Sequence, residues 1–207
     1  MDRLFLVQHC QSEHHVSGLT GGWTDTPLTD LGRRQAERAG QRLKELVAGK
    51  PCQLASSDLK RAVQTAEIIA QAIDVEVLAL PALRELNNGA ATGQTEEWAQ
   101  KNIDRTNWSL FDWSGFEGAE TWRQFYRRVA QCMDELAAES AHLPIIVTHG
   151  GTVSNIVTWW LRLPLDVLPE RTPFACSPGG ISLLKTNKYG NPVVAYLNDT
   201  SHLAGLA

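Results

Sequence analysis

The sequence lacks the features that mark membrane, secreted and nucleic-acid-binding proteins. It has no apolar run that approaches the roughly 20 residues of a membrane-spanning helix, and its first residues become polar too early for a signal peptide. The formal net charge is only -4, so no basic surface for nucleic acid or lipid is indicated. We therefore expect a cytoplasmic protein that binds neither nucleic acid nor a membrane, and the sequence does not indicate a homo-oligomer.

Cysteine is scarce and shows no paired spacing. The four cysteines are Cys10, Cys52, Cys132 and Cys176. Because no two of them form a C-x-x-C pair, neither a zinc ribbon nor a disulfide framework is predicted. The chain also has no internal repeat and no low-complexity linker, and 207 residues suit one well-buried core. We expect a single domain over residues 1–207.

Two apolar runs in the sequence end abruptly at a histidine. Residues 4–7 are followed by Gln8 and His9, and residues 144–147 lead into His149 and two glycines. Continuous apolar runs are typical of parallel strands that are covered on both faces. In open α/β sheets, ligands bind beyond the carboxyl ends of such strands. Both histidines are therefore predicted to lie at one edge of a sheet.

A third segment brings an arginine to the same edge. Residues 54–56 predict a short strand that leads into a helix with Arg61 in its first turn. By spacing alone, the two histidines fit a general base pair, metal ligands, or a nucleophile with a helper. Two histidines and an arginine together suit a phosphoryl group, because guanidinium binds phosphate oxygens and neutral imidazole can attack phosphorus.

Strands and helices alternate along the chain, which predicts a mostly parallel sheet covered on both sides. Helices are expected after an N-cap at Thr29, over residues 59–73 with Asp58 as N-cap, after a capping box of Thr121 and Gln124, and over residues 152–161. Further strands are expected over residues 76–80 and in a terminal hairpin of residues 181–184 and 193–197. The weakly patterned stretch 87–118 predicts a lid or specificity insert.

Five segments, in order, resemble the histidine phosphatase superfamily, also called the phosphoglycerate mutase-like family. They are G-W-T-D-T-P-L-T from Gly22, S-S-D-L-K-R-A-V-Q-T-A-E from Ser56, L-R-E-L-N-N-G from Leu83, V-T-H-G-G from Val147 and L-N-D-T-S-H-L from Leu197, and they follow Q-H-C at residues 8–10, where the family has its Arg-His-Gly signature. Ordered matches of this kind are specific where one alone would be weak. The resemblance implies a three-layer α/β/α sandwich with a mostly parallel central sheet.

The resemblance also implies an activity, namely hydrolysis of a small phosphorylated substrate through a phosphohistidine, without cofactor or metal. It assigns catalytic roles to His9, Arg61, Glu85 and His149, and substrate contacts to Gln8, His15, Gly22 and Gly150. His9 is the implied nucleophile, and Arg61 and His149 hold the phosphoryl oxygens. Glu85 is the implied proton donor to the leaving oxygen; the alternative is a solvated acid that pairs with Arg84.

The chain departs from the family pattern at the site itself. Gln8 and Cys10 replace the arginine and glycine of the family's Arg-His-Gly, while His15 and Leu19 stand where the family has asparagine and arginine. An arginine that stabilises phosphoryl transfer is worth about 10³ to 10⁵ in rate, so we expect weakened turnover. A histidine at position 14 or 15, protonated beside phosphate, would replace part of that charge.

These departures keep two alternatives open. One is a phosphoglycerate mutase-type phosphotransferase, which is disfavoured because Lys101 and Arg105 are the only cations in the insert. The other is a low-activity pseudophosphatase that binds a phosphorylated ligand.

Three further interpretations of the site are disfavoured. Cys10 is not expected to be a nucleophile, because no arginine follows it to close a phosphate loop. A metal site of His9, Cys10, His14 and His15 is not expected, because neighbouring strand residues point to opposite faces. Four tryptophans in or beside the insert are expected to fill the core under a loop rather than to stack on a leaving group. They are Trp98, Trp108, Trp113 and Trp122.

Overall fold

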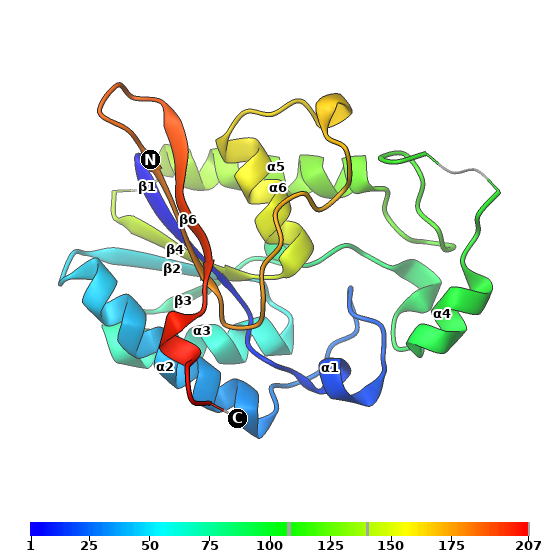
Figure 1. The fold of residues 1–207 in the computed structure, drawn as a ribbon, viewed down its shortest axis with the longest axis horizontal. Helices are drawn as coiled ribbons and strands as arrows, with labels where there is room; N and C mark the ends of the chain where they lie inside the picture. Colours follow the sequence, from blue (N-terminus) through cyan, green and yellow to red (C-terminus); the bar gives the residue numbers. More distant parts are fainter. Residues whose placement is uncertain (107–108, 140, 207) are drawn as a thin grey trace.

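The computed structural model describes residues 1–106, 109–139 and 141–206, which form a six-stranded sheet of order β3-β2-β4-β1-β5-β6 (Figure 1). The strands are β1 (Arg3–Gln8), β2 (Cys52–Ser56), β3 (Val77–Ala79), β4 (Leu143–Thr148), β5 (Ile181–Thr186) and β6 (Pro192–Asp199). Strands β1 to β4 pair in parallel, whereas β5 runs antiparallel to β1 and β6 antiparallel to β5. The mostly parallel sheet and the terminal hairpin are both confirmed.

Helices cover both faces of this sheet, and each face has its own apolar core. Helices α2 (Asp30–Val47) and α3 (Lys60–Ile73) lie on one face, and α5 (Trp122–Glu139) and α6 (Gly150–Trp160) lie on the other (Figure 1). Strand β1 shows why: Phe5 and Val7 belong to the first core, whereas Leu4 and Leu6 belong to the second. Alternating side chains that are apolar on both faces require cover on both faces. The predicted three-layer α/β/α sandwich is confirmed.

Local capping determines two of the helix starts as predicted. The Thr29 hydroxyl accepts a hydrogen bond from Gly32 N–H at 3.0 Å at the start of α2. Thr121 and Gln124 form the reciprocal capping box of α5, with distances of 2.8 and 3.2 Å. The prediction of Asp58 as the N-cap of α3 is wrong. Leu59 occupies that position, because the Asp58 carboxylate binds Arg84 at 2.6 Å through a contact distant in sequence.

The remaining elements are short. They are α1 (Glu13–Ser17), α4 (Glu96–Asn102) and the 3₁₀ turns Pro81–Leu83, Gly89–Ala91, Leu165–Val167 and Ser201–Leu203. Thr95 is the N-cap of α4, and the five residues of α1 are too few to show helical periodicity in the sequence. Trp108 lies outside the described residues, and the lid role of stretch 87–118 stays a prediction. None of the described helices has the length and hydropathy to cross a membrane.

The sheet order brings the predicted site segments together. Strands β2, β4 and β1 are neighbours, and Gln8 pairs with Thr148 while Ser56 pairs with Val147. The three strands therefore end at the same level. His9, Ser57 and His149 follow these ends directly, so the carboxyl edge of the sheet carries the candidate site.

Candidate active site

His9 is held as a neutral imidazole whose unprotonated nitrogen faces an arginine. Its ring is buried, with 3 % of the residue exposed. Nδ1 donates to the Cys10 carbonyl at 2.8 Å, and Nε2 accepts from Arg61 Nε–H at 3.1 Å. Burial and the Arg61 charge hold the pKa of His9 well below its usual range. The lone pair on Nε2 is therefore available at neutral pH, as a nucleophile requires.

Arg61 is a buried cation that is fixed by two backbone carbonyls. Only 1 % of it is exposed, and its Nη1 and Nη2 donate to the carbonyls of Thr24 and Gly22, both at 2.7 Å. Burial lowers the pKa of Arg61 to about 10, so the group remains charged at neutral pH. Three of the five guanidinium N–H groups are used by these two bonds and the bond to His9, which leaves two for an anion.

Gly22 supports Arg61 through its carbonyl oxygen. Its φ of +56° favours glycine, and a Cβ atom here would clash with the side-chain oxygen of Asn88. The direct contact of Gly22 with substrate stays a prediction. In the structure, the observed contribution of Gly22 is to orient the guanidinium.

His149 lies beside His9 at the start of α6. The ring centroids are 5.0 Å apart, and His149 is the N-cap residue of the helix. Its Nε2 lies 2.8 Å from Ser57 Oγ, which itself accepts from Leu59 N–H at 3.3 Å. When the hydroxyl donates its proton to Nε2, the neutral His149 ring carries its own proton on Nδ1. Among the described residues Nδ1 is buried without a partner, and an unpaired donor at a helix amino terminus suits an anion.

Glu85 accepts hydrogen bonds from two backbone amides, and it lines part of a pocket. Its Oε1 accepts from Leu86 N–H and its Oε2 from Gly151 N–H, both at 2.8 Å. These bonds favour the charged form, but burial outweighs them and raises the pKa of Glu85. The alternative pairing with Arg84 does not occur, because Arg84 binds Asp58. A raised pKa suits a carboxylic acid that donates a proton.

Gln8 occupies the position at which the family pattern has an arginine. Only 8 % of the residue is exposed, and its Oε1 is buried without a partner among the described residues. A Cβ atom built on Gly150 would lie 3.6 Å from this oxygen. Gln8 and Gly150 therefore face each other at the amino terminus of α6, beside His149.

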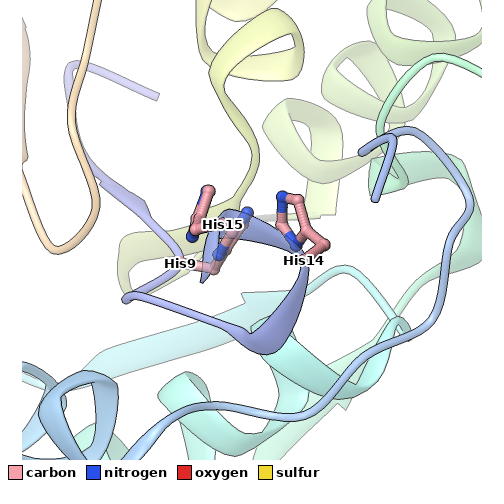
Figure 2. Close-up of side chains that lie close together, drawn as sticks. All are labelled: His9, His14 and His15. Atoms are coloured by element: carbon pink, nitrogen blue, oxygen red, sulfur yellow. The ribbon is translucent and has the colours of Figure 1, made fainter. Parts of the chain in front are cut away.

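Helix α1 folds His14 and His15 back over His9, as Figure 2 shows. The ring centroids of His14 and His15 are 5.9 and 5.4 Å from that of His9. Ser12 N–H donates to His15 Nδ1 at 3.1 Å, so neutral His15 carries its proton on Nε2. Burial, with the nearby charges of His15 and Arg61, lowers the pKa of His14 to about 3, and burial likewise lowers the pKa of His15. A bound anion would raise both pKa values.

Strand alternation was expected to keep His9, Cys10, His14 and His15 apart, and this expectation is wrong for the three histidines. Cys10 does point away from His9: it is fully buried against Leu28 and Ala36, and burial raises the pKa of its thiol to about 12. The three histidines, however, converge, and one ring nitrogen from each lies within 4.8 Å of the others. The reason is the turn of α1, which strand alternation does not describe.

The surroundings of these histidines nevertheless suit an anion better than a cation. Arg61 lies 3.1 Å from His9 Nε2, and a metal ion there would meet its positive charge. His15 Nδ1 is already occupied by a backbone N–H, which leaves a donor rather than a lone pair on Nε2. The expectation that the site holds no metal stays a prediction.

The sequence interpretation missed Ser57 and Thr24. Ser57 orients His149, and the Thr24 carbonyl holds Arg61. The second serine of S-S-D, directly after a predicted strand, is a signal that could have indicated Ser57. A backbone carbonyl leaves no trace in the sequence, so the part played by Thr24 required the structure.

Fold and site together define an α/β protein with a candidate anion site at the carboxyl edge of its sheet. The sequence matches the model of the histidine phosphatase superfamily (branch 1) over residues 4–200. The chain therefore belongs to the histidine phosphatase superfamily.

Relatives and solved structures agree with this assignment. The chain is 31% identical to the probable phosphoglycerate mutase GpmB of Proteus mirabilis, over 100% of this chain and 97% of the relative. It is also similar to the alpha-ribazole phosphatase of Shigella flexneri, with 25% identity, a TM-score of 0.80, and coverage of 95% of this chain and 96% of the other. A mycobacterial glucosyl-3-phosphoglycerate phosphatase shares the fold, with 23% identity, a TM-score of 0.79, and coverage of 96% and 99%.

Proposed function

We propose that this protein hydrolyses small phosphomonoesters through a phosphohistidine on His9. The observation that carries the proposal is the pairing of His9 with Arg61. His9 is a neutral imidazole whose unprotonated Nε2 accepts a hydrogen bond from Arg61 Nε–H, and among the described residues the buried guanidinium keeps two further N–H groups without a partner. That combination places a nucleophile beside a fixed receptor for phosphoryl oxygens.

The two chemical steps use the residues as follows. Arg61 and His149 bind the phosphoryl oxygens, and His9 Nε2 attacks phosphorus while the bond to the leaving oxygen breaks. Glu85 gives its proton to that oxygen, so the alcohol leaves neutral. In the second step Glu85, now a carboxylate, takes a proton from water as the water oxygen attacks phosphorus and the N–P bond breaks, which releases phosphate.

Gln8 and the α1 histidines are expected to set the rate. Gln8 offers hydrogen bonds without the charge that stabilises phosphoryl transfer. The substrate phosphate itself favours protonation of His14 and His15, whose rings lie next to His9. Two imidazoles then replace part of the missing charge, which we expect to give a slow rather than an inactive enzyme.

Hydrolysis is preferred over mutase chemistry, although relatives carry the name probable phosphoglycerate mutase. A mutase must retain an anionic bisphosphate between its two transfer steps, which requires cations near the site. Lys101 of the insert is exposed and pairs with Glu97 at 2.5 Å, and Arg105 is exposed at the end of α4. Alpha-ribazole phosphatase, a similar structure, is named as a phosphatase.

Covalent trapping tests the proposal. Rapid quenching in alkaline detergent after mixing with phenyl phosphate labelled in its phosphorus should give a protein label that is stable in base and labile in acid. His9→Ala should remove the label and lower kcat by roughly 10⁴-fold or more, as losses of a nucleophile do. His142→Ala, at an exposed histidine of the loop before β4, is the matched control and should keep both.

The other outcomes identify the alternatives. Bound phosphate without label or turnover would indicate a pseudophosphatase, and conversion of 3-phosphoglycerate to 2-phosphoglycerate with a bisphosphate primer would indicate a mutase. Either result would overturn hydrolysis as the proposed activity.

A further inference from the structure

A small pocket adjoins the predicted proton donor, Glu85. It has a volume of about 340 Å³, and Glu85 and Gly151 form part of its wall. Gly21 and Gly22 line it as well, and Gly22 is the residue whose carbonyl holds Arg61. The pocket therefore lies next to the candidate phosphate site, and it has the size of a small-molecule subsite.

The remaining wall of this pocket is chiefly apolar. Leu86, Ala91, Phe116 and Trp122 contribute its apolar surface. Phe116 packs against Trp98, with ring centroids 6.1 Å apart and planes at 24°, so its ring is held in place. Trp122 is buried and packs edge-on against Phe125 at 5.0 Å. Held aromatic rings favour a planar or apolar group over a flexible polar one.

Within the described part of the chain, the pocket contains no cationic side chain. Of the described residues that line it, Glu85 alone is charged. Arg128 lies closest to the Glu85 backbone, but its five N–H groups are all committed. They bond the carbonyls of Ala82, Arg84 and Glu85 and the carboxylate of Glu120. Arg84, which is stacked on Trp23, gives its Nε and Nη2 to Asp58.

A substrate carboxylate in this pocket would therefore have no cation to bind and would lose its hydration. Burying an unpaired charge is costly, and Glu85 would add repulsion whenever it is ionised. An uncharged apolar group would instead gain by leaving water and contacting the rings. The pocket wall therefore favours phosphomonoesters whose alcohol is uncharged over those whose alcohol carries a carboxylate.

We infer that the substrate is the phosphomonoester of an uncharged alcohol with an apolar or aromatic body, which binds in the pocket formed by Leu86, Ala91, Phe116 and Trp122. This inference rests on the proposed function. It makes phosphoglycerate a poor substrate, although relatives are named for it. Phe116 is the residue that determines the specificity, because its ring faces both Trp98 and the pocket.

The test compares two substrates whose leaving alcohols differ in charge. The kcat/KM for benzyl phosphate should exceed that for 3-phosphoglycerate by roughly 10-fold to 10²-fold, the range in which an apolar pocket discriminates. Phe116→Lys, which places a cation on the wall, should reduce that ratio about 10-fold or more by favouring the carboxylate. Tyr189→Lys adds the same charge at a residue that is 76% exposed in the β5–β6 turn, and should leave the ratio unchanged.

The outcomes separate this inference from the proposed function. If both esters are hydrolysed and 3-phosphoglycerate is equal or better, the substrate class is wrong and the hydrolase stands. If folded protein hydrolyses neither, the proposed function is wrong, and calorimetry then decides the pocket. Benzylphosphonate binding at least about 10-fold tighter than methylphosphonate would support the pocket as a ligand site, and equal binding would overturn it.

Discussion

At the residue scale, Gln8 is the position where this site differs most from its family pattern. The side chain is nearly buried and faces Gly150, and its oxygen has no hydrogen-bond partner among the described residues. An arginine here would lie near Arg61 in the free protein, where two cations repel each other, but phosphate would neutralise both. Repulsion between the two arginines would destabilise the free protein, whereas both would stabilise the phosphate-bound states. The Gln8→Arg substitution should therefore lower stability and raise the rate.

Gln8→Arg is therefore predicted to raise kcat for phenyl phosphate by about 10-fold or more, because an added guanidinium stabilises the transferring phosphoryl group. The measurement is steady-state kinetics together with the melting temperature, which should fall without phosphate and recover with it. Gln8→Met is the matched control, since it keeps the length of the side chain but neither charge nor hydrogen bonds. If kcat of the Gln8→Arg variant were unchanged or lower, the missing charge would not be what limits turnover.

At the element scale, the start of α6 combines several parts of the site within three residues. His149 is the N-cap, Gly150 faces Gln8, and Gly151 N–H bonds Glu85. Gly151 leaves room for the Glu85 carboxyl, because a Cβ atom there would clash with Glu85 Oε1. The helix is thus positioned against the predicted proton donor by the absence of a side chain.

Gly151→Ala should displace the Glu85 carboxyl and remove general acid catalysis. We expect kcat for benzyl phosphate, whose alcohol needs a proton to leave, to fall by about 10² to 10⁴. The rate for 4-nitrophenyl phosphate should fall much less, because nitrophenolate leaves without a proton. Glu85→Gln should reproduce this selective pattern. Equal losses for both esters would mean that the alanine disrupts phosphate binding rather than proton donation.

At the scale of the whole molecule, the site is a cluster of neutral imidazoles inside a folded protein. His9 and His149 are almost fully buried, and burial with the Arg61 charge holds the pKa of each well below the usual value. In the unfolded chain both would bind a proton near pH 6.5. The unfolded state therefore binds more protons than the native state below that pH, and acid favours unfolding.

The free energy of unfolding is accordingly predicted to decrease as the pH falls from about 6.5, by roughly 1.4 kcal/mol per pH unit for each of the two buried histidines. Urea denaturation at about pH 7.5 and about pH 5.5 measures the slope. His149→Asn should reduce this pH dependence of the free energy of unfolding by the contribution of one histidine. Stability that was flat or rising towards acid pH would contradict the neutral imidazole cluster.

Much of the architecture could be predicted because its causes are local in sequence. The apolar runs of β1 and β4 are buried on both faces, and the caps at Thr29 and Thr121 are formed by residues three positions away. The ends of strands identified His9, Arg61 and His149 for the same reason, since topology places strand ends at one edge. The motif order then indicated the family before any contact was known.

The sequence by itself determined the strands, the order of the layers and the side chains that meet at the edge of the sheet, because side-chain periodicity and capping act over a few residues. Only the tertiary structure decided the pairing of Asp58 with Arg84, the return of His14 and His15 over His9, and the cation-free pocket beside Glu85. Each of these depends on through-space neighbours, and the pKa of a buried group depends on the same neighbours. The chemistry of the site is therefore a property of the fold rather than of any one segment.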